Sequence, residues 1–205
     1  MNWSKRAVDV GLAIIFGLLL IVPLTLVVLL LLFREGRPIL YISERMKTPT
    51  QGFWLIKLRT MRPSAENAGV TGGDKSDRIP PIYRLLRRSR FDEIPQLWNV
   101  LRGDMSFVGP RPPLRLYVEA FPDLYAAVLR NRPGLTGLAT LHFHRHEDLV
   151  LSTTSSAEQT DAVYRRRCVP RKARLDLIYQ QHQSGCFDFV LIWRTARRIL
   201  ARRMR

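Results

Sequence analysis

The sequence has few cysteines and few acidic residues. Its two cysteines, Cys168 and Cys186, are too few for a disulfide framework and lack the C-x₂-C spacing of a zinc site. A small disulfide-rich secreted protein is therefore excluded, and a reducing compartment is indicated. Acidic residues number 17 against 33 lysines and arginines, so the formal net charge of +16 excludes an acidic disordered chain. Such an excess of cations is typical of proteins that bind nucleic acid or an anionic membrane, and composition does not choose between them.

The sequence also lacks internal repeats, low-complexity segments and Gly/Ser-rich linkers after residue 33. A chain of 205 residues with 46% hydrophobic content is expected to fold as roughly one ordinary domain. We divide it into an N-terminal membrane segment, residues 1–36, and a folded domain, residues 37–205.

The membrane segment contains an uncharged apolar run of 24 residues, from 10 to 33. About 20 apolar residues suffice for a helix to span a bilayer, whereas the core of a cleaved signal peptide is normally ~7–15 residues long. Basic residues flank the run on both sides, so the positive-inside rule does not choose which end is cytoplasmic. Pro23 lies near the midpoint, where it removes a hydrogen bond and kinks a helix. Two topologies stay open: one tilted span, and a hairpin that returns to the same face.

Residues 52–59 alternate in the manner of a strand. Trp54, Ile56 and Leu58 are predicted to form an apolar face, with Lys57 and Arg59 on the opposite face. Two cations placed in this way are able to hold a diphosphate, although a solvated strand face is the commoner meaning.

The rest of the chain is predicted to be largely helical. Residues 65–81 are rich in glycine and proline and indicate a loop, whereas residues 114–129, 171–182 and 187 onward are predicted to be helices. Residues 194–205 carry six arginines and no acid, with apolar residues such as Trp193 at helical spacing. A basic amphipathic helix of this kind favours a membrane interface over a solvated tail or a nucleic-acid-binding segment.

Two adjacent carboxylates, Asp92 and Glu93, follow a cluster of arginines at 87, 88 and 90. We predict a helix over residues 89–101, because Pro95 is tolerated only in a first turn, where the helix dipole also favours anions. The predicted buried face consists of five apolar side chains: Phe91, Ile94, Leu97, Trp98 and Leu101.

This carboxylate pair has two interpretations. It can form ordinary surface salt bridges, which contribute little to stability. Alternatively, one carboxylate is a nucleophile or a ligand of Mg²⁺, which binds one or two carboxylates together with substrate phosphates. The stiff Gly-Pro-Arg-Pro turn at residues 109–112 favours the second interpretation, because it would hold Arg111 in place as a bidentate phosphate ligand.

Five stretches of the chain match, in order, the motifs of a known family. They are Lys5, Arg6 and Asp9 before the membrane helix, then residues 57–61 (KLRTM), 92–101 (DEIPQLWNVL), 103–112 (GDMSFVGPRP) and 132–137 (RPGLTG). Through these stretches the chain resembles, over nearly its whole length, the bacterial sugar transferases. These are the monotopic phosphoglycosyl transferases that begin lipid-linked glycan assembly.

The resemblance implies a mainly helical α+β fold, with an N-terminal re-entrant helix-break-helix and a small catalytic domain on the cytoplasmic face of the bacterial inner membrane. It implies transfer of a sugar 1-phosphate from a UDP-sugar to undecaprenyl phosphate, with release of UMP. Asp92 is then the nucleophile that forms a covalent phosphosugar intermediate, Glu93 is its partner, and the pair holds Mg²⁺. Four cations are expected to bind the substrate: Lys57, Arg59, Arg88 and Arg111.

The membrane helix departs from the family pattern at one position. The family breaks this helix at a Ser-Pro pair, whereas this chain has Val22 before Pro23. The kink is expected to survive, but a hydroxyl that could satisfy the freed backbone groups is missing.

The resemblance also suggests the partners. It implies contact with inner-membrane lipids and downstream glycosyltransferases in exopolysaccharide, O-antigen or glycoprotein glycan synthesis. It implies no nucleic acid and leaves a homodimer open. The sugar is not identified, and residues 65–81 and 142–167 are the candidates for that choice. Three later residues are assigned to structure: Asp176, Tyr179 and Asp188. The alternative is a membrane-anchored basic protein that binds anionic lipid or nucleic acid without catalysis.

Overall fold

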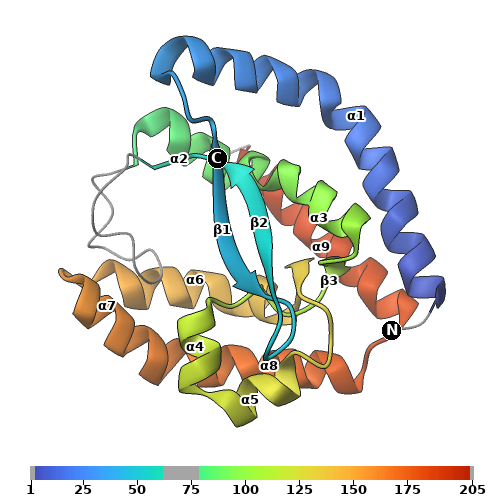
Figure 1. Ribbon diagram of the computed structural model, residues 1–205, viewed down its shortest axis with the longest axis vertical. Helices are drawn as coiled ribbons and strands as arrows, with labels where there is room; N and C mark the ends of the chain where they lie inside the picture. The colour runs from blue at the N-terminus through green and yellow to red at the C-terminus, as the bar shows by residue number, and fades with distance from the viewer. Residues whose placement is uncertain (1–2, 62–78, 204–205) are drawn as a thin grey trace.

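The computed structural model describes residues 3–61 and 79–203. These residues form a mainly helical body with two small two-stranded sheets, in agreement with the predicted α+β class (Figure 1). The helical elements are α1 (Trp3–Glu35), α2 (Pro81–Arg88), the 3₁₀ helix η2 (Phe91–Gln96), α3 (Leu97–Arg102), α4 (Arg115–Ala120), α5 (Pro122–Val128), α6 (Leu138–Ser152), α7 (Ala157–Val163), the π-helical turn η3 (Tyr164–Cys168), α8 (Val169–Gln181) and α9 (Gly185–Arg203).

The two sheets are built differently. Strands β1 (Leu40–Met46) and β2 (Gly52–Leu58) form an antiparallel hairpin. Strands β3 (Ser106–Val108) and β4 (Gly134–Thr136) form a short parallel pair. Most of the loop predicted at 65–81 lies outside the described residues, which resume at residue 79, shortly before α2.

Helix α1 is continuous and bends across the molecule (Figure 1). The predicted break in the helix is not confirmed, because the helix passes through Pro23. A proline removes one hydrogen bond and crowds the preceding turn, which bends a helix without ending it. Although Val22 brings no hydroxyl, that of Thr25 donates to the carbonyl of Ile21 at 2.8 Å, a bond that often bends helices further.

Both arms of α1 lie against the same folded body. Near its start, the Arg6 guanidinium donates to the carbonyl oxygens of Val100 (2.6 Å) and Leu101 (2.7 Å). Near its end, Leu31 is buried in a cluster with Leu58 of β2. The helix is long and apolar enough to cross a membrane, and most of its apolar side chains face outward. A bent helix held at both ends on one body is compatible with a hairpin that enters and leaves on one face.

Strand β2 confirms the predicted strand and its alternation, and Leu58 is the buried residue of the predicted apolar face. Phe53 and Leu55 are buried in the core, whereas Trp54 is 63% exposed. Lys57 continues the alternation of Phe53 and Leu55, so it points inward toward the cavity described below. Arg59 lies just beyond the strand and also lines that cavity.

The predicted helix over residues 89–101 is divided in two. The 3₁₀ helix η2 contains Pro95, and the α-helix α3 begins only after it, at Leu97. Trp98 is 56% exposed rather than buried. Asn99 takes the inward place instead, because its amide donates to the carbonyl of Trp54 at 2.7 Å and accepts from the Ile56 amide at 3.2 Å. The asparagine thereby fixes α3 against β2.

The later helices mostly follow the sequence prediction. Helices α8 and α9 are confirmed, whereas the helix predicted over 114–129 is two short helices, α4 and α5, separated at Phe121. Pro122 begins α5, since a proline cannot continue the preceding helix but is tolerated in a first turn.

Helix α9 packs against the body along one side, where Leu191 is fully buried, and exposes an apolar stripe on another. The Tyr179 hydroxyl donates to Asp188 at 2.5 Å, and Asp188 also pairs with Lys5 of α1. Tyr179 and Asp188 therefore have the structural role expected of them. Phe189 and Trp193, four residues apart on α9, are both exposed. This stripe agrees with the predicted amphipathic helix.

Candidate active site

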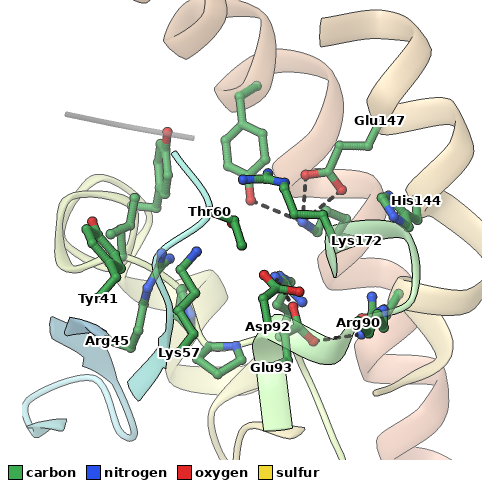
Figure 2. A pocket seen from close by; sticks show the side chains of 18 of the residues that line it. Tyr41, Arg45, Lys57, Thr60, Arg90, Asp92, Glu93, His144, Glu147 and Lys172 are labelled. Atoms are coloured by element: carbon green, nitrogen blue, oxygen red, sulfur yellow. Dashed lines mark hydrogen bonds and ion pairs between the residues drawn. The ribbon is translucent and has the colours of Figure 1, made fainter. Parts of the chain in front are cut away.

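A cavity of about 740 Å³ opens between the β1–β2 hairpin, η2 and helices α4, α6 and α8. Figure 2 shows Asp92 and Glu93 in this cavity, with Lys57 and Arg45 on one side and Lys172 and Glu147 on the other. The structure thus brings all the predicted polar site residues into one lining: Lys57, Arg59, Arg88, Asp92, Glu93 and Arg111. Pro23, in contrast, lies in the membrane helix α1.

A local backbone feature places the two carboxylates. Arg90, the residue before η2, has φ +54°, a left-handed conformation that turns the chain sharply into the 3₁₀ helix. Asp92 and Glu93 follow in the first turn, as predicted. The turn is held because Arg90 donates both to Glu93 Oε2 and to the carbonyl of Leu135, each at 3.1 Å.

Asp92 is a buried carboxyl group with a raised pKa. It is 6% exposed. Burial, together with the charge of Glu93, raises the pKa of Asp92 to about 6, although Lys57 opposes this rise. Asp92 is therefore mostly ionised at neutral pH, poorly solvated and close to a cation, which are the properties of an oxyanion available for reaction.

Glu93 has the opposite environment. Its Oε1 accepts from Arg111 at 3.0 Å, and its Oε2 accepts from Arg90 at 3.1 Å. Burial alone would raise the pKa of Glu93, but the two guanidinium groups outweigh it and lower the pKa to about 2. Neighbouring carboxylates thus have clearly separated pKa values, and such separation is how one site assigns different roles to two similar groups.

Lys57 and Arg111 both provide positive charge near Asp92. Burial lowers the pKa of Lys57 to about 8, while the attraction of Asp92 works against that decrease. The Lys57 ammonium lies 5.1 Å from the centre of the Tyr41 ring, a cation–π contact that limits where it can move. Glu93, opposed by burial, raises the pKa of Arg111, so Arg111 keeps its charge at any relevant pH.

Arg111 is positioned by a close contact between two separate motifs. Gly109 packs so tightly against the chain at 132–134 that a Cβ atom on it would lie 2.1 Å from the carbonyl oxygen of Arg132. Gly134 is equally constrained, since a Cβ there would lie 2.2 Å from the Gly109 nitrogen. The motif at 103–112 and the motif at 132–137 therefore form one unit around β3 and β4, and Arg111 projects from it.

Part of the cavity lining carries no motif in the sequence. Arg45 of β1 lines the cavity, and its buried Nε has no hydrogen-bond partner among the described residues. Glu147, Lys172 and Asp176 line the helical side, so Asp176, predicted to be structural, also faces the cavity. These residues are far apart in the sequence, and only the position of Glu147 within 142–167 points toward them.

The residues present fit a divalent metal only in part. Both oxygens of Glu93 already accept hydrogen bonds from arginines, so direct ligation by Glu93 would require one of these bonds to break. Asp92 can supply one carboxylate. In residues 3–61 and 79–203 no group of three or more His, Cys, Asp or Glu side chains gathers into a protein-only metal site. Mg²⁺ accepts this arrangement when substrate phosphates complete its ligands.

The fold and this cavity define a membrane-associated protein with a basic site around one buried carboxylate. Comparison with known proteins gives the family. A family model described as Bacterial sugar transferase matches residues 1–202, so the chain belongs to the bacterial sugar transferase family and is a transferase by class.

Individual relatives carry more detailed names. The putative undecaprenyl-phosphate N-acetylgalactosaminyl 1-phosphate transferase of Bacillus subtilis is 41% identical over 121 residues, 58% of this chain and 67% of the relative. The UDP-glucose:undecaprenyl-phosphate glucose-1-phosphate transferase of Caulobacter vibrioides is 40% identical over 143 residues, 68% of this chain. This chain spans only 54% of that relative. Exopolysaccharide production protein ExoY of Sinorhizobium fredii is 32% identical over 209 residues, 94% of this chain and 83% of the relative.

Proposed function

We propose that this protein transfers a sugar 1-phosphate from a UDP-sugar to undecaprenyl phosphate. The observation that carries the proposal is the buried carboxylate of Asp92, which lies in a cavity lined by cations while its neighbour Glu93 is held by two arginines. The names of the relatives supply the same donor and acceptor classes.

The first step forms a covalent intermediate. A carboxylate oxygen of Asp92 attacks the β-phosphorus of the UDP-sugar. The bond between that phosphorus and the bridging oxygen breaks, and the oxygen leaves with its electron pair as part of UMP. Lys57, Arg59, Arg88, Arg111 and Arg45 all line the cavity and stabilise the charge on the diphosphate and on the leaving group.

The second step restores the enzyme. A phosphate oxygen of undecaprenyl phosphate attacks the same phosphorus, the bond from phosphorus to the Asp92 oxygen breaks, and a polyprenyl diphosphate sugar is released. The pKa of about 6 suits Asp92 for both steps. Because the carboxylate is poorly solvated, it attacks phosphorus readily in the first step, and because it is still a weak base, it leaves phosphorus readily in the second.

We also propose Mg²⁺ as the cofactor. Asp92, together with the substrate phosphates, would hold the ion. Glu93 would position Arg111 and Arg90, or it would give up its hydrogen bond to one of them and bind the metal directly. When bound, Mg²⁺ would supply neutralising charge to the diphosphate.

The membrane features fit an acceptor whose polyprenyl tail stays in the bilayer. We place the protein at the cytoplasmic face of the bacterial inner membrane, with α1 entering and leaving one leaflet. Support comes from the attachment of both arms of α1 to one body and from the exposed stripe on α9. Basic juxtamembrane residues attract anionic lipid headgroups. The product is expected to pass to downstream glycosyltransferases in exopolysaccharide, O-antigen or glycoprotein glycan synthesis, and a homodimer is compatible with this role.

A transfer assay tests the proposal. Purified protein in nanodiscs is given undecaprenyl phosphate, Mg²⁺ and a panel of UDP-sugars labelled in the sugar. We expect labelled lipid with at least one donor, labelled protein when the acceptor is omitted, and loss of both in Asp92→Asn. Asp123→Asn, at an exposed position of α5, is the matched control that should retain activity. Absence of lipid product with every donor would leave the alternative of a non-catalytic lipid-binding protein. Full activity of Asp92→Asn would instead refute the covalent mechanism, because transfer would then proceed without Asp92.

A labelling experiment tests the topology separately. Single cysteines are introduced as Asn2→Cys and Arg37→Cys in a background that carries Cys168→Ala and Cys186→Ser. In sealed membrane vesicles of one orientation, both positions should react with a membrane-impermeant maleimide from the same side. Reaction from opposite sides would contradict the hairpin.

A further inference from the structure

The cavity extends past Asp92 into a polar chamber that the phosphate chemistry does not use. Its polar lining includes Glu147 of α6, Tyr164 of η3, and Lys172 and Asp176 of α8. The Lys172 ammonium donates to Glu147 at 3.0 Å and to the Tyr164 hydroxyl at 3.2 Å (Figure 2). We call these four residues the chamber wall.

The chamber wall is largely buried, and hydrogen bonds hold three of its four residues together. Lys172 is 14% exposed and Glu147 19% exposed in their side chains, and Tyr164 is buried. Asp176 is buried too, and its Oδ1 has no hydrogen-bond partner among the residues that the structure describes. Burial raises the pKa of Asp176 to about 7, although Lys172 opposes the rise, so this carboxyl can donate or accept at neutral pH. A buried polar atom without a partner is uncommon, and one that lines a cavity is available to a ligand.

The chamber wall lies next to the reacting group rather than in a separate pocket. Arg111 connects the two parts, because it pairs with Glu93, and the charge of Glu147 adds to that of Glu93 in raising the pKa of Arg111. Figure 2 shows Lys172 and Glu147 on one side of Asp92, with Lys57 on the other. A donor whose β-phosphorus lies at Asp92 therefore has one neighbouring group in reach of the chamber wall.

The sequence of the two steps indicates which part of the donor lies against the chamber wall. After the first step UMP must leave, and a membrane-bound acceptor must approach the same phosphorus, so both need the open side of the cavity. The sugar stays covalently attached through both steps and has no need to move. A set of fixed donors and acceptors also suits a ring of hydroxyl groups, because a site built to hydrogen-bond a hydroxyl rejects analogues that lack it.

We propose that Glu147, Tyr164, Lys172 and Asp176 form the sugar subsite and determine which UDP-sugar is accepted. The inference rests on the proposed function, since it assigns the part of the donor that this reaction retains. It also gives a structural basis for the expectation that residues 142–167 bear on sugar choice.

The test compares donors that differ in one substituent. UDP-glucose, UDP-galactose and their N-acetylamino counterparts are compared by kcat/KM for UMP release, and their affinities are compared with that of UDP by calorimetry. The variants are the charge-neutral pair Glu147→Gln with Lys172→Met, and the single changes Tyr164→Phe and Asp176→Asn. Glu44→Gln is the control, because Glu44 pairs with Arg115 on the exposed side of the hairpin, outside the cavity lining.

We expect the preference between two epimeric donors to change by about 10- to 100-fold, the range for loss of hydrogen bonds to charged groups. Affinity for the preferred UDP-sugar should fall toward that of UDP, while UDP itself binds as before. If UDP affinity falls equally, the chamber holds the nucleotide and the inference is overturned. Unchanged donor preference in all variants, with active wild-type protein, overturns it as well.

The outcomes separate this inference from the proposed function. If wild-type protein binds no UDP-sugar and transfers none, both fall together; if it transfers sugar with an unchanged ranking in the variants, only the sugar subsite falls. Thermal melting establishes that each variant is folded. Should the double variant not fold, Tyr164→Phe and Asp176→Asn test the same subsite, because each keeps the shape of its side chain.

Discussion

Replacing Asp92 with asparagine should make the protein more stable while it removes the proposed nucleophile. The pKa of Asp92 is about 6 in the folded protein against 3.8 for the free group. The folded state thus holds its proton more tightly than the unfolded state, and stability falls as pH rises between these two values. A difference of about 2 pKa units corresponds to about 3 kcal/mol of unfolding free energy above pH 7, which Asp92→Asn should recover.

The adjacent carboxylate provides the opposite control. The pKa of Glu93 is about 2 against a usual 4.5, because Arg111 and Arg90 outweigh the effect of burial. This group stabilises the folded state at any pH above 4.5 and loses that contribution as pH falls toward 2. Glu93→Gln should therefore destabilise the protein by about 3 kcal/mol at pH 8. Two neighbouring substitutions that each remove one negative charge are expected to act in opposite directions.

Thermal melting of wild type and both variants at pH 4, 6 and 8 checks this reasoning. For a domain of this size about 3 kcal/mol corresponds to a melting-temperature shift of about 6–12 °C. The gain of Asp92→Asn should be nearly absent at pH 4 and full at pH 8. Equal melting temperatures at pH 8, or a gain that does not depend on pH, would refute the electrostatic cost assigned to Asp92.

Three further predictions concern the site and its support. The rate of UMP release without acceptor should rise through about pH 6 as Asp92 ionises and decrease above about pH 8 as Lys57 loses its proton; a flat profile from pH 5 to 9 would contradict both roles. Arg111→Lys should lower kcat/KM by about 10- to 100-fold, because lysine lacks the planar guanidinium that can bind Glu93 and a phosphate together. Steady-state kinetics equal to those of the wild type would contradict this prediction. Gly109→Ala should lower the unfolding free energy by about 1–3 kcal/mol, since its Cβ would lie 2.1 Å from the Arg132 carbonyl oxygen. Gly17→Ala is the control, because a Cβ there has nothing within 4 Å. Equal melting curves for the two variants would contradict the prediction and show that the backbone shifts to accommodate the methyl group.

The chemistry of the site can be predicted from the sequence to a large extent. Short motifs single out Lys57, Asp92, Glu93 and Arg111, and the structure places all four in one cavity. These positions can be predicted because adjacent residues and stiff turns fix the local geometry of a short motif. The different environments of Asp92 and Glu93 could not be predicted, since they depend on Arg111, which lies 18 residues beyond Glu93.

The apolar faces are predicted less well, for a physical reason. The sequence pattern assigns Trp98 to the buried face of its helix, yet Trp98 is mostly exposed, and so is Trp54 on the apolar face of β2. Periodicity identifies an apolar face but not what covers it, and a protein that meets lipid keeps apolar side chains outside as well as inside. The chamber wall escapes prediction for another reason: Glu147 and Lys172 lie 25 residues apart on different helices, so only the packing of α6 against α8 brings them together.

The attachment of both arms of α1 also changes how the protein relates to the thickness of the bilayer. A helix of 33 residues is about 50 Å long, well beyond a hydrocarbon core of about 30 Å, so a straight span would have to tilt strongly or thicken the lipid around it. In the proposed topology the bent helix enters only one leaflet and has no such requirement. Hydrophobic mismatch, which sorts and strains spanning proteins, would then have little effect on this protein, and Asp92 would keep its depth when lipid chain length changes.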